Sequence, residues 1–209
     1  MDFLQTFLMV KINNYYVAVI FWNIFLALLP CFIVWRLSRG YYLKKWGNIS
    51  GMNRLLFGAV FLIWFFFFPN TAYLIADIRH LVDYCREPDY FRACVNEAWV
   101  VPLFFSYAAT GVPTFYYSLR KMAMILEKLF GKAAGRLFPL LMIPVTALGL
   151  LLGLVGRFNS WEVLSKPLDI VGAALGYLID DIMLINLIVY TLMLYLFYYG
   201  IGYLWKKRK

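Results

Sequence analysis

The sequence has none of the short motifs that define the common serine-hydrolase, zinc-protease and nucleotide-binding classes. Its 209 residues contain one histidine and three cysteines, and no GxSxG or HExxH pattern occurs. A nucleophilic serine or a zinc site of these types is therefore excluded. No nucleotide-binding motif is present, so nothing in the sequence indicates direct use of ATP.

Charged residues are also scarce, whereas apolar residues are abundant. Only 15% of the residues are charged, while 64% are hydrophobic and 20% are aromatic, and the mean hydropathy is +0.73. An ordinary soluble domain has about 25% charged and about 45–50% apolar residues. Several apolar runs reach the roughly 20 residues that cross a bilayer. The composition therefore predicts an all-α, polytopic integral membrane bundle in the cell membrane.

Hydropathy and flanking charge predict five membrane spans. The spans cover residues 15–35, 55–76, 98–119, 137–156 and 182–204. Ile170–Ile179 is then a short interfacial or re-entrant piece. Phe3–Val10, which lacks the features of a secretory signal, is expected to lie at the interface. No Pro/Gly/Ser-rich linker or fixed repeat divides the chain, which favours a single domain over residues 1–209.

The basic residues predict the orientation of this bundle. Fourteen of the twenty Lys and Arg residues lie after the first and third spans and in the tail KKRK. These segments contain only one acidic residue, Glu127. Lys and Arg accumulate on the cytoplasmic side of a membrane, which puts the amino terminus outside and the carboxyl terminus inside. Topology thus explains the net charge of +9. The expected partner is the lipid bilayer, and no nucleic acid is expected.

The stretch FFFFPNTAYLIADIRHL is unusual because a strongly apolar run becomes polar at its end. Pro69 has no N–H, so a backbone carbonyl before it needs another partner or a bend. Four polar residues follow at i, i+3, i+7 and i+10, on one helical face: Asn70, Tyr73, Asp77 and His80. Polar groups in a membrane helix turn toward other helices or a wet cavity. We therefore predict a polar seam that opens outward.

Two further segments deliver polar groups to the same outer depth. The sequence RFNSWE ends the fourth span and carries Arg157, Asn159, Ser160 and Glu162. The sequence YLIDD precedes the fifth span and carries Asp180 and Asp181. We expect Arg157 to lie close enough to Asp77 or His80 to interact with one of them, because an unpaired charge at that depth is costly.

Three stretches resemble, in order and spacing, the bacterial membrane proteins of the domain of unknown function 1361 family: WNIFLALLP (22–30), FPNTAYLIADIRHL (68–81) and GLLLGLVGRFNSWEVLSKP (149–167). The resemblance supports the membrane topology. It also singles out a set of site residues, namely Asn70, Tyr73, Asp77, His80, Arg157, Asn159, Ser160 and Trp161. The sequence departs from the family pattern at Ala72, Leu154 and Glu162, where the family has proline, arginine and aspartate. No biochemical activity is implied.

The same side chains allow more than one chemistry. Asp77 and His80 could ligate one metal ion, and three carboxylates could complete its shell, those of Glu97, Asp180 and Asp181. With a single histidine, an ion pair between Asp77 and an arginine is the simpler interpretation. Asp77 and His80 could also act as an acid–base pair. Asp180 and Asp181 are better explained as the amino-terminal cap of the last span. The sequence identifies no cofactor.

The cysteines make one further prediction. Cys31 lies inside the first span and is expected to be a small packing residue. Cys85 and Cys94 share the outer loop between the second and third spans, where they either form a disulfide bond or remain two free thiols.

Function classes of different kinds remain open. The favoured one is a binding or transport-accessory membrane protein whose outward site holds a small polar solute, an ion or a lipid headgroup. The alternative is a small membrane enzyme that acts on an outer-leaflet lipid or envelope precursor. A third is a structural subunit that binds another membrane protein. Five spans without inverted repeats argue against a complete carrier.

Overall fold

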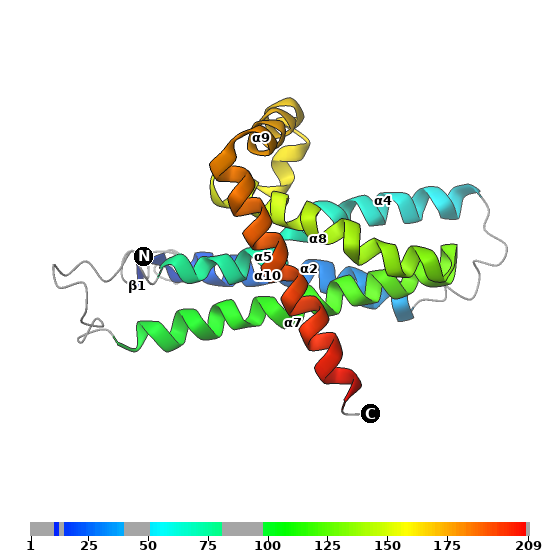
Figure 1. Cartoon of the computed structure of the whole chain (residues 1–209), viewed down its shortest axis with the longest axis horizontal. Helices are drawn as coiled ribbons and strands as arrows, with labels where there is room; N and C mark the ends of the chain where they lie inside the picture. Colours follow the sequence, from blue (N-terminus) through cyan, green and yellow to red (C-terminus); the bar gives the residue numbers. More distant parts are fainter. Residues whose placement is uncertain (1–10, 13–14, 40–50, 81–97, 208–209) are drawn as a thin grey trace, which may run out of the picture.

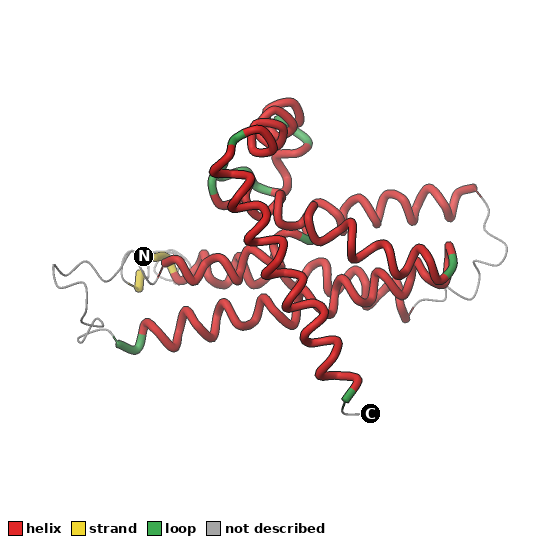
Figure 2. The backbone as a smooth tube through the Cα atoms, in the orientation of Figure 1, coloured by secondary structure: helices red, strands yellow, loops and turns green. Residues whose placement is uncertain are grey.

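The computed structural model of the chain describes residues 11–12, 15–39, 51–80 and 98–207, and most of these are helical (Figure 2). Two short strands, β1 (Lys11–Ile12) and β2 (Tyr15–Tyr16), form an antiparallel pair. The helices follow in the order α2 (Val17–Arg39), α4 (Gly51–Phe67), α5 (Pro69–Ala76), η2 (Asp77–Arg79), α7 (Val100–Phe130), α8 (Lys132–Leu154), η4 (Ser160–Val163), α9 (Pro167–Ile179) and α10 (Asp181–Lys206).

Four of the described helical segments are long and apolar enough to cross a membrane: Val17–Arg39, Leu55–Arg79, Lys132–Leu154 and Asp181–Leu204. They coincide with the predicted spans at 15–35, 55–76, 137–156 and 182–204. The predicted short piece at Ile170–Ile179 coincides with α9, a shorter apolar helix. The prediction of a helical membrane protein is confirmed to this extent. The interfacial segment predicted at Phe3–Val10 lies outside the described residues.

The third predicted span, at 98–119, falls on α7, which is not among those four helices. The basic segment that follows it is helical except at Gly131: α7 continues to Phe130 and α8 begins at Lys132. Gly131, at φ 91°, makes the turn between them alone. The helix continues through this basic segment because the segment also contains Met122, Ala123 and Ile125, whose side chains pack into the core.

The long helices form a bundle in which α2, α4–α5, α7 and α8 run along the long axis of the molecule (Figure 1). The last helix, α10, crosses α7 and α8 obliquely (Figure 1). The Tyr195 hydroxyl anchors it by donating to the Leu140 carbonyl of α8 at 2.6 Å. The helix α9 lies to one side of the bundle, with none of its residues fully buried.

Aromatic residues of α4 and α7 fill the centre of the bundle. The Trp64 ring stacks on Phe68 at 4.5 Å between centroids, and Phe68 stacks on Phe115 at 5.5 Å. All three side chains are fully buried. The indole N–H of Trp64 donates to the Ser118 hydroxyl at 2.9 Å, which satisfies both buried polar groups. This packing fixes α4 against α7 just below the break at Pro69.

Candidate functional site

The candidate site lies beside a break between helices α4 and α5, just before Pro69. Helix α4 ends at Phe67 and α5 begins at Pro69. Two side chains then bond to carbonyls at the break: the Asn70 amide donates to Phe67 O at 2.9 Å, and the Thr71 hydroxyl donates to Phe68 O at 2.8 Å. In hydrocarbon each unpaired backbone group is costly. The polar residues after the proline therefore stabilise the break between α4 and α5, and Asn70 also belongs to the candidate site.

A cavity of about 320 Å³ lies between α2, α5 and the turn that follows α8. Seven of the eleven candidate residues line it, namely Asn70, Tyr73, His80, Arg157, Asn159, Ser160 and Trp161. The α2 residues Trp22 and Asn23 line the same cavity. Two segments about eighty residues apart in sequence are thus brought around one space. None of the described residues that line it is acidic.

Direct contacts join these segments. The Asn70 amide donates to the Ser160 hydroxyl at 2.8 Å, which ties α5 to the turn after α8. The rings of Trp22 and Trp161 meet edge to face, with 6.3 Å between centroids. Both tryptophans are about half exposed, at 50% and 43%. They form an aromatic wall beside the polar groups, an arrangement suited to a ligand with polar and apolar parts.

Arg157 adopts a backbone conformation that is uncommon for its residue type. Its φ is 57°, in the left-handed region, where it is the only non-glycine residue of the described chain. The turn after α8 is closed by the Phe158 N–H, which donates to Leu152 O at 3.2 Å. The guanidinium lies within electrostatic range of the Tyr73 phenol, and both side chains line the cavity. The strained turn thus directs a cation into the cavity.

Asp77 lies behind the cavity and is completely buried. Its Oδ2 accepts hydrogen bonds from the Asn23 amide at 3.1 Å and the Tyr107 hydroxyl at 2.9 Å. Its Oδ1 lies 3.7 Å from His80 Nε2. The expected contact of Arg157 with Asp77 or His80 is not among the contacts of the described residues. Asp77 instead connects α5 to α2 and α7.

A second arginine lies near Tyr73. The Arg79 Nη1 donates to the Leu154 carbonyl at 3.3 Å. In the part of the chain that the structure describes, its Nε and Nη2 are buried and have no hydrogen-bond partner. The phenol of Tyr73 is within electrostatic range of both Arg79 and Arg157. Positive charge therefore gathers around Tyr73, one of the residues that line the cavity.

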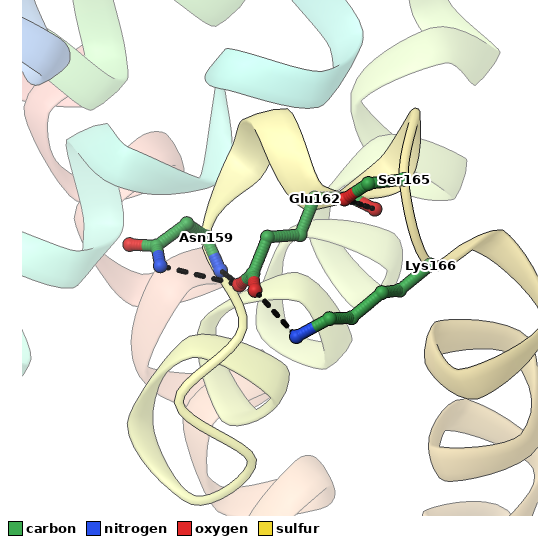
Figure 3. A network of polar contacts seen from close by, with 4 residues as sticks. All are labelled: Asn159, Glu162, Ser165 and Lys166. Atoms are coloured by element: carbon green, nitrogen blue, oxygen red, sulfur yellow. Dashed lines mark hydrogen bonds and ion pairs between the residues drawn. The ribbon is translucent and has the colours of Figure 1, made fainter.

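Glu162 stabilises the turn that carries Asn159, Ser160 and Trp161 (Figure 3). Its Oε2 accepts from the Asn159 backbone N–H at 2.7 Å, and its Oε1 lies 3.1 Å from Lys166 Nζ. The pKa of the Glu162 carboxyl lies below its ordinary value. The main cause is the hydrogen bond from the Asn159 N–H, and the hydrogen bond from the Lys166 ammonium adds to it. The carboxylate therefore holds the turn together and is not one of the cavity residues.

Asp180 and Asp181 are not brought to the cavity. The Asp180 Oδ1 accepts from the Met183 N–H at 2.8 Å and caps α10, and Asp181 occupies the first turn of that helix. In the part of the chain that the structure describes, no three His, Cys, Asp or Glu side chains gather as a metal site would require. Glu97, Cys85 and Cys94 lie outside the described residues.

Four residues of this region were missed as site residues. Trp22 and Asn23 line the cavity, Tyr107 bonds to Asp77, and Arg79 flanks Tyr73. Asn23 is the only Asn, Asp, Gln or Glu among the apolar residues of α2, which was a usable signal. Tyr107 gave none, because tyrosines are frequent throughout this sequence.

The fold and the cavity define a helical membrane protein with a polar cavity among its helices. The chain belongs to the family described as "Protein of unknown function (DUF1361)", which matches residues 22–197. The resemblance seen in the three sequence stretches is thereby confirmed. Neither the curated proteins nor the solved structures include a match to the chain.

Proposed function

We propose that the protein crosses the cell membrane five times, with its amino terminus outside and its carboxyl terminus in the cytoplasm. Helix α7 is the additional span: at 1.5 Å per residue its 31 residues extend about 46 Å. It contacts α2, α5 and α8, which reduces its exposure to lipid. The basic ends of α2 and α7 and the basic start of α8 lie at the same end of the bundle (Figure 1), as the positive-inside rule requires.

In this orientation the cavity beside Pro69 opens on the outer side, and its role is to bind a small polar solute, an ion or a lipid headgroup. The observation that carries this function is the convergence of seven polar or aromatic candidate residues on one cavity. A volume of about 320 Å³ lies within the range of small-molecule sites. With Arg157 in the lining and no acid among the described lining residues, the site favours a ligand with an anionic or acceptor-rich group.

Native mass spectrometry of the whole chain, purified in a mild detergent, tests this function. The comparison uses wild type, Asn70→Ala, Arg157→Gln and, as a charge-matched control, the exposed Arg136→Gln. A small bound mass should remain in wild type and in the control and be lost from both cavity variants at equal folded yield. If the mass is absent from wild type, or if all variants retain it, the cavity is not the binding site.

The His80–Asp77 geometry favours a second candidate, an enzyme that acts on an outer-leaflet lipid. His80 lines the cavity and its Nε2 faces a buried carboxylate at 3.7 Å, as a general base oriented by an aspartate would. Such contacts are often long before substrate binds. Asp77→Asn, His80→Ala and Arg157→Lys separate the alternatives in cells. Loss of phenotype at normal yield supports a working site, whereas a parallel loss of yield indicates a structural role.

A further inference from the structure

A second cavity, of about 440 Å³, lies between α2 and α7 at the other end of α2. It is distinct from the outer cavity, because it is lined by the last turns of α2 and the carboxyl-terminal half of α7. Three of its lining residues are cations, Arg39, Lys121 and Lys128. None of the described residues that line it is acidic. We call this space the basic cavity.

The basic cavity is built by matching faces of two helices. On α7 the lining includes Tyr117, Lys121 and Lys128, at i, i+4 and i+11, which share one helical face. On α2 the lining includes Trp35 and Arg39, one turn apart. The convergence of three cations on one concave space is therefore a property of the fold.

Aromatic rings hold two of the three cations. The Arg39 guanidinium lies over the Trp35 ring, 4.7 Å from its centroid, and Lys121 Nζ lies 5.8 Å from the centroid of Tyr117. Both distances are within the range of cation–π attraction. No ion pair of these cations with a carboxylate occurs among the described residues. Three positive charges that share a cavity without an acid repel one another, and a bound anion would remove that repulsion.

We propose that the basic cavity binds a phosphate group. Three cations match the charge and the several acceptor oxygens of a phosphate monoester or diester. The cavity lies where α2 ends, at Arg39, the depth at which phospholipid phosphates lie beside a spanning helix. The rings of Trp35 and Tyr117 provide apolar contact beside the charges. The phosphate belongs to an anionic phospholipid or to a soluble phosphate compound.

The test compares three forms of the full chain in detergent: wild type, the triple variant Arg39→Gln/Lys121→Gln/Lys128→Gln, and a control triple variant. The control, Arg36→Gln/Lys132→Gln/Arg136→Gln, removes the same charge from exposed positions outside the cavity. One arm measures retention of phosphatidylglycerol against phosphatidylcholine by native mass spectrometry. The other arm measures the thermal shift produced by inorganic phosphate or pyrophosphate. If the cavity triple variant does not fold, Lys128→Gln alone, at an exposed position, takes its place.

Wild type and the control should bind phosphatidylglycerol, phosphate or both, and the cavity variant should bind at least tenfold more weakly. Preferential retention of phosphatidylglycerol alone identifies a lipid as the source, and a thermal shift by phosphate or pyrophosphate alone identifies a soluble compound. Displacement of phosphatidylglycerol by pyrophosphate shows that both sources use one phosphate site. If wild type binds neither probe, or if the control loses as much binding as the cavity variant, the proposal is wrong.

Discussion

At the scale of the residue, Arg157 combines an uncommon backbone conformation with a place in the lining of the outer cavity. Helix-ending turns normally place glycine in the left-handed region, because a side chain there costs about 1–2 kcal/mol. This chain has glycine at position 156 and still uses arginine at φ 57°. Strain of this kind persists where the surroundings require it, and it clusters at functional sites. The electrostatic contact with Tyr73 at the cavity is consistent with such a requirement.

The strain at Arg157 predicts an unusual pattern of substitutions. Arg157→Gly should be at least as stable as wild type, whereas Arg157→Ala should be less stable than Arg157→Gly by about 1 kcal/mol, because only glycine adopts this φ freely. Both variants should lose the ligand of the outer cavity. Thermal unfolding in one detergent measures the stabilities. Equal destabilisation by glycine and alanine would mean that side-chain contacts, and not the backbone, determine the effect.

Glu162 predicts a pH dependence for the turn that carries Ser160 and Trp161. Its pKa is lowered in the folded protein, so its contribution is complete above the unfolded-state pKa of about 4.3 and is lost as the pH falls through the folded-state value. Amide exchange at Lys166, whose N–H donates to Glu162 O at 2.7 Å, should remain slow at neutral pH. Its protection, the ratio of the intrinsic to the observed exchange rate, should fall on acidification as the Glu162 carboxylate is protonated.

Glu162→Gln is the matched control for this titration. Glutamine keeps an acceptor for the Asn159 N–H but cannot ionise. Protection at Lys166 in this variant should be weaker at neutral pH and nearly flat across the acidic range. The same pH dependence in wild type and Glu162→Gln would assign the transition to another group.

At the scale of elements, α8 approaches α5 closely beside the outer cavity, where Gly149 and Pro69 both belong to the lining. A Cβ added to Gly149 would lie 2.7 Å from Pro69 Cγ, a distance too short for two carbon atoms. Gly149→Ala should therefore separate the helices or strain the break, with a loss of about 1–3 kcal/mol in the free energy of unfolding. Gly176→Ala in α9 has open space and should be neutral or slightly stabilising. Thermal unfolding of both variants compares them, and equal melting temperatures would contradict the close approach.

The polar stripe after Pro69 could be predicted from the spacing of its residues, but which of its side chains face the cavity could not. An ideal helix puts Asn70, Tyr73, Asp77 and His80 on one face. Three of them line the cavity, whereas Asp77 faces α2 and α7. The cause is tertiary: the hydrogen bonds from the Asn23 amide and the Tyr107 hydroxyl hold the Asp77 carboxylate toward α2 and α7. The position of Arg157 was likewise hidden, because a left-handed arginine has no sequence signal.

At the scale of the whole molecule, hydropathy identified the helices that face lipid and underestimated the one that faces other helices. Helix α7 carries tyrosine, serine and threonine and is less apolar than the four candidate spans, yet its residues Phe104, Phe115 and Leu119 are fully buried against neighbouring helices. Helix contacts in membranes favour small and polar residues, so a central span can be less apolar. Under the five-span proposal, flanking charge supplies the boundary of the α7 span that hydropathy alone does not.

The number of spans decides on which sides of the membrane the two ends of the chain lie. With α7 as a span the count is odd and the ends lie on opposite sides, whereas without it the count is even and they lie on the same side. In a background without native cysteines, an impermeant maleimide should label Tyr16→Cys in intact cells and Lys207→Cys only after permeabilisation. Lys166→Cys, before α9, is the control for the outer side. Labelling of Tyr16→Cys and Lys207→Cys from the same side would remove α7 from the spans. Labelling of Lys207→Cys alone in intact cells would reverse the orientation, and the cavity beside Pro69 would then face the cytoplasm.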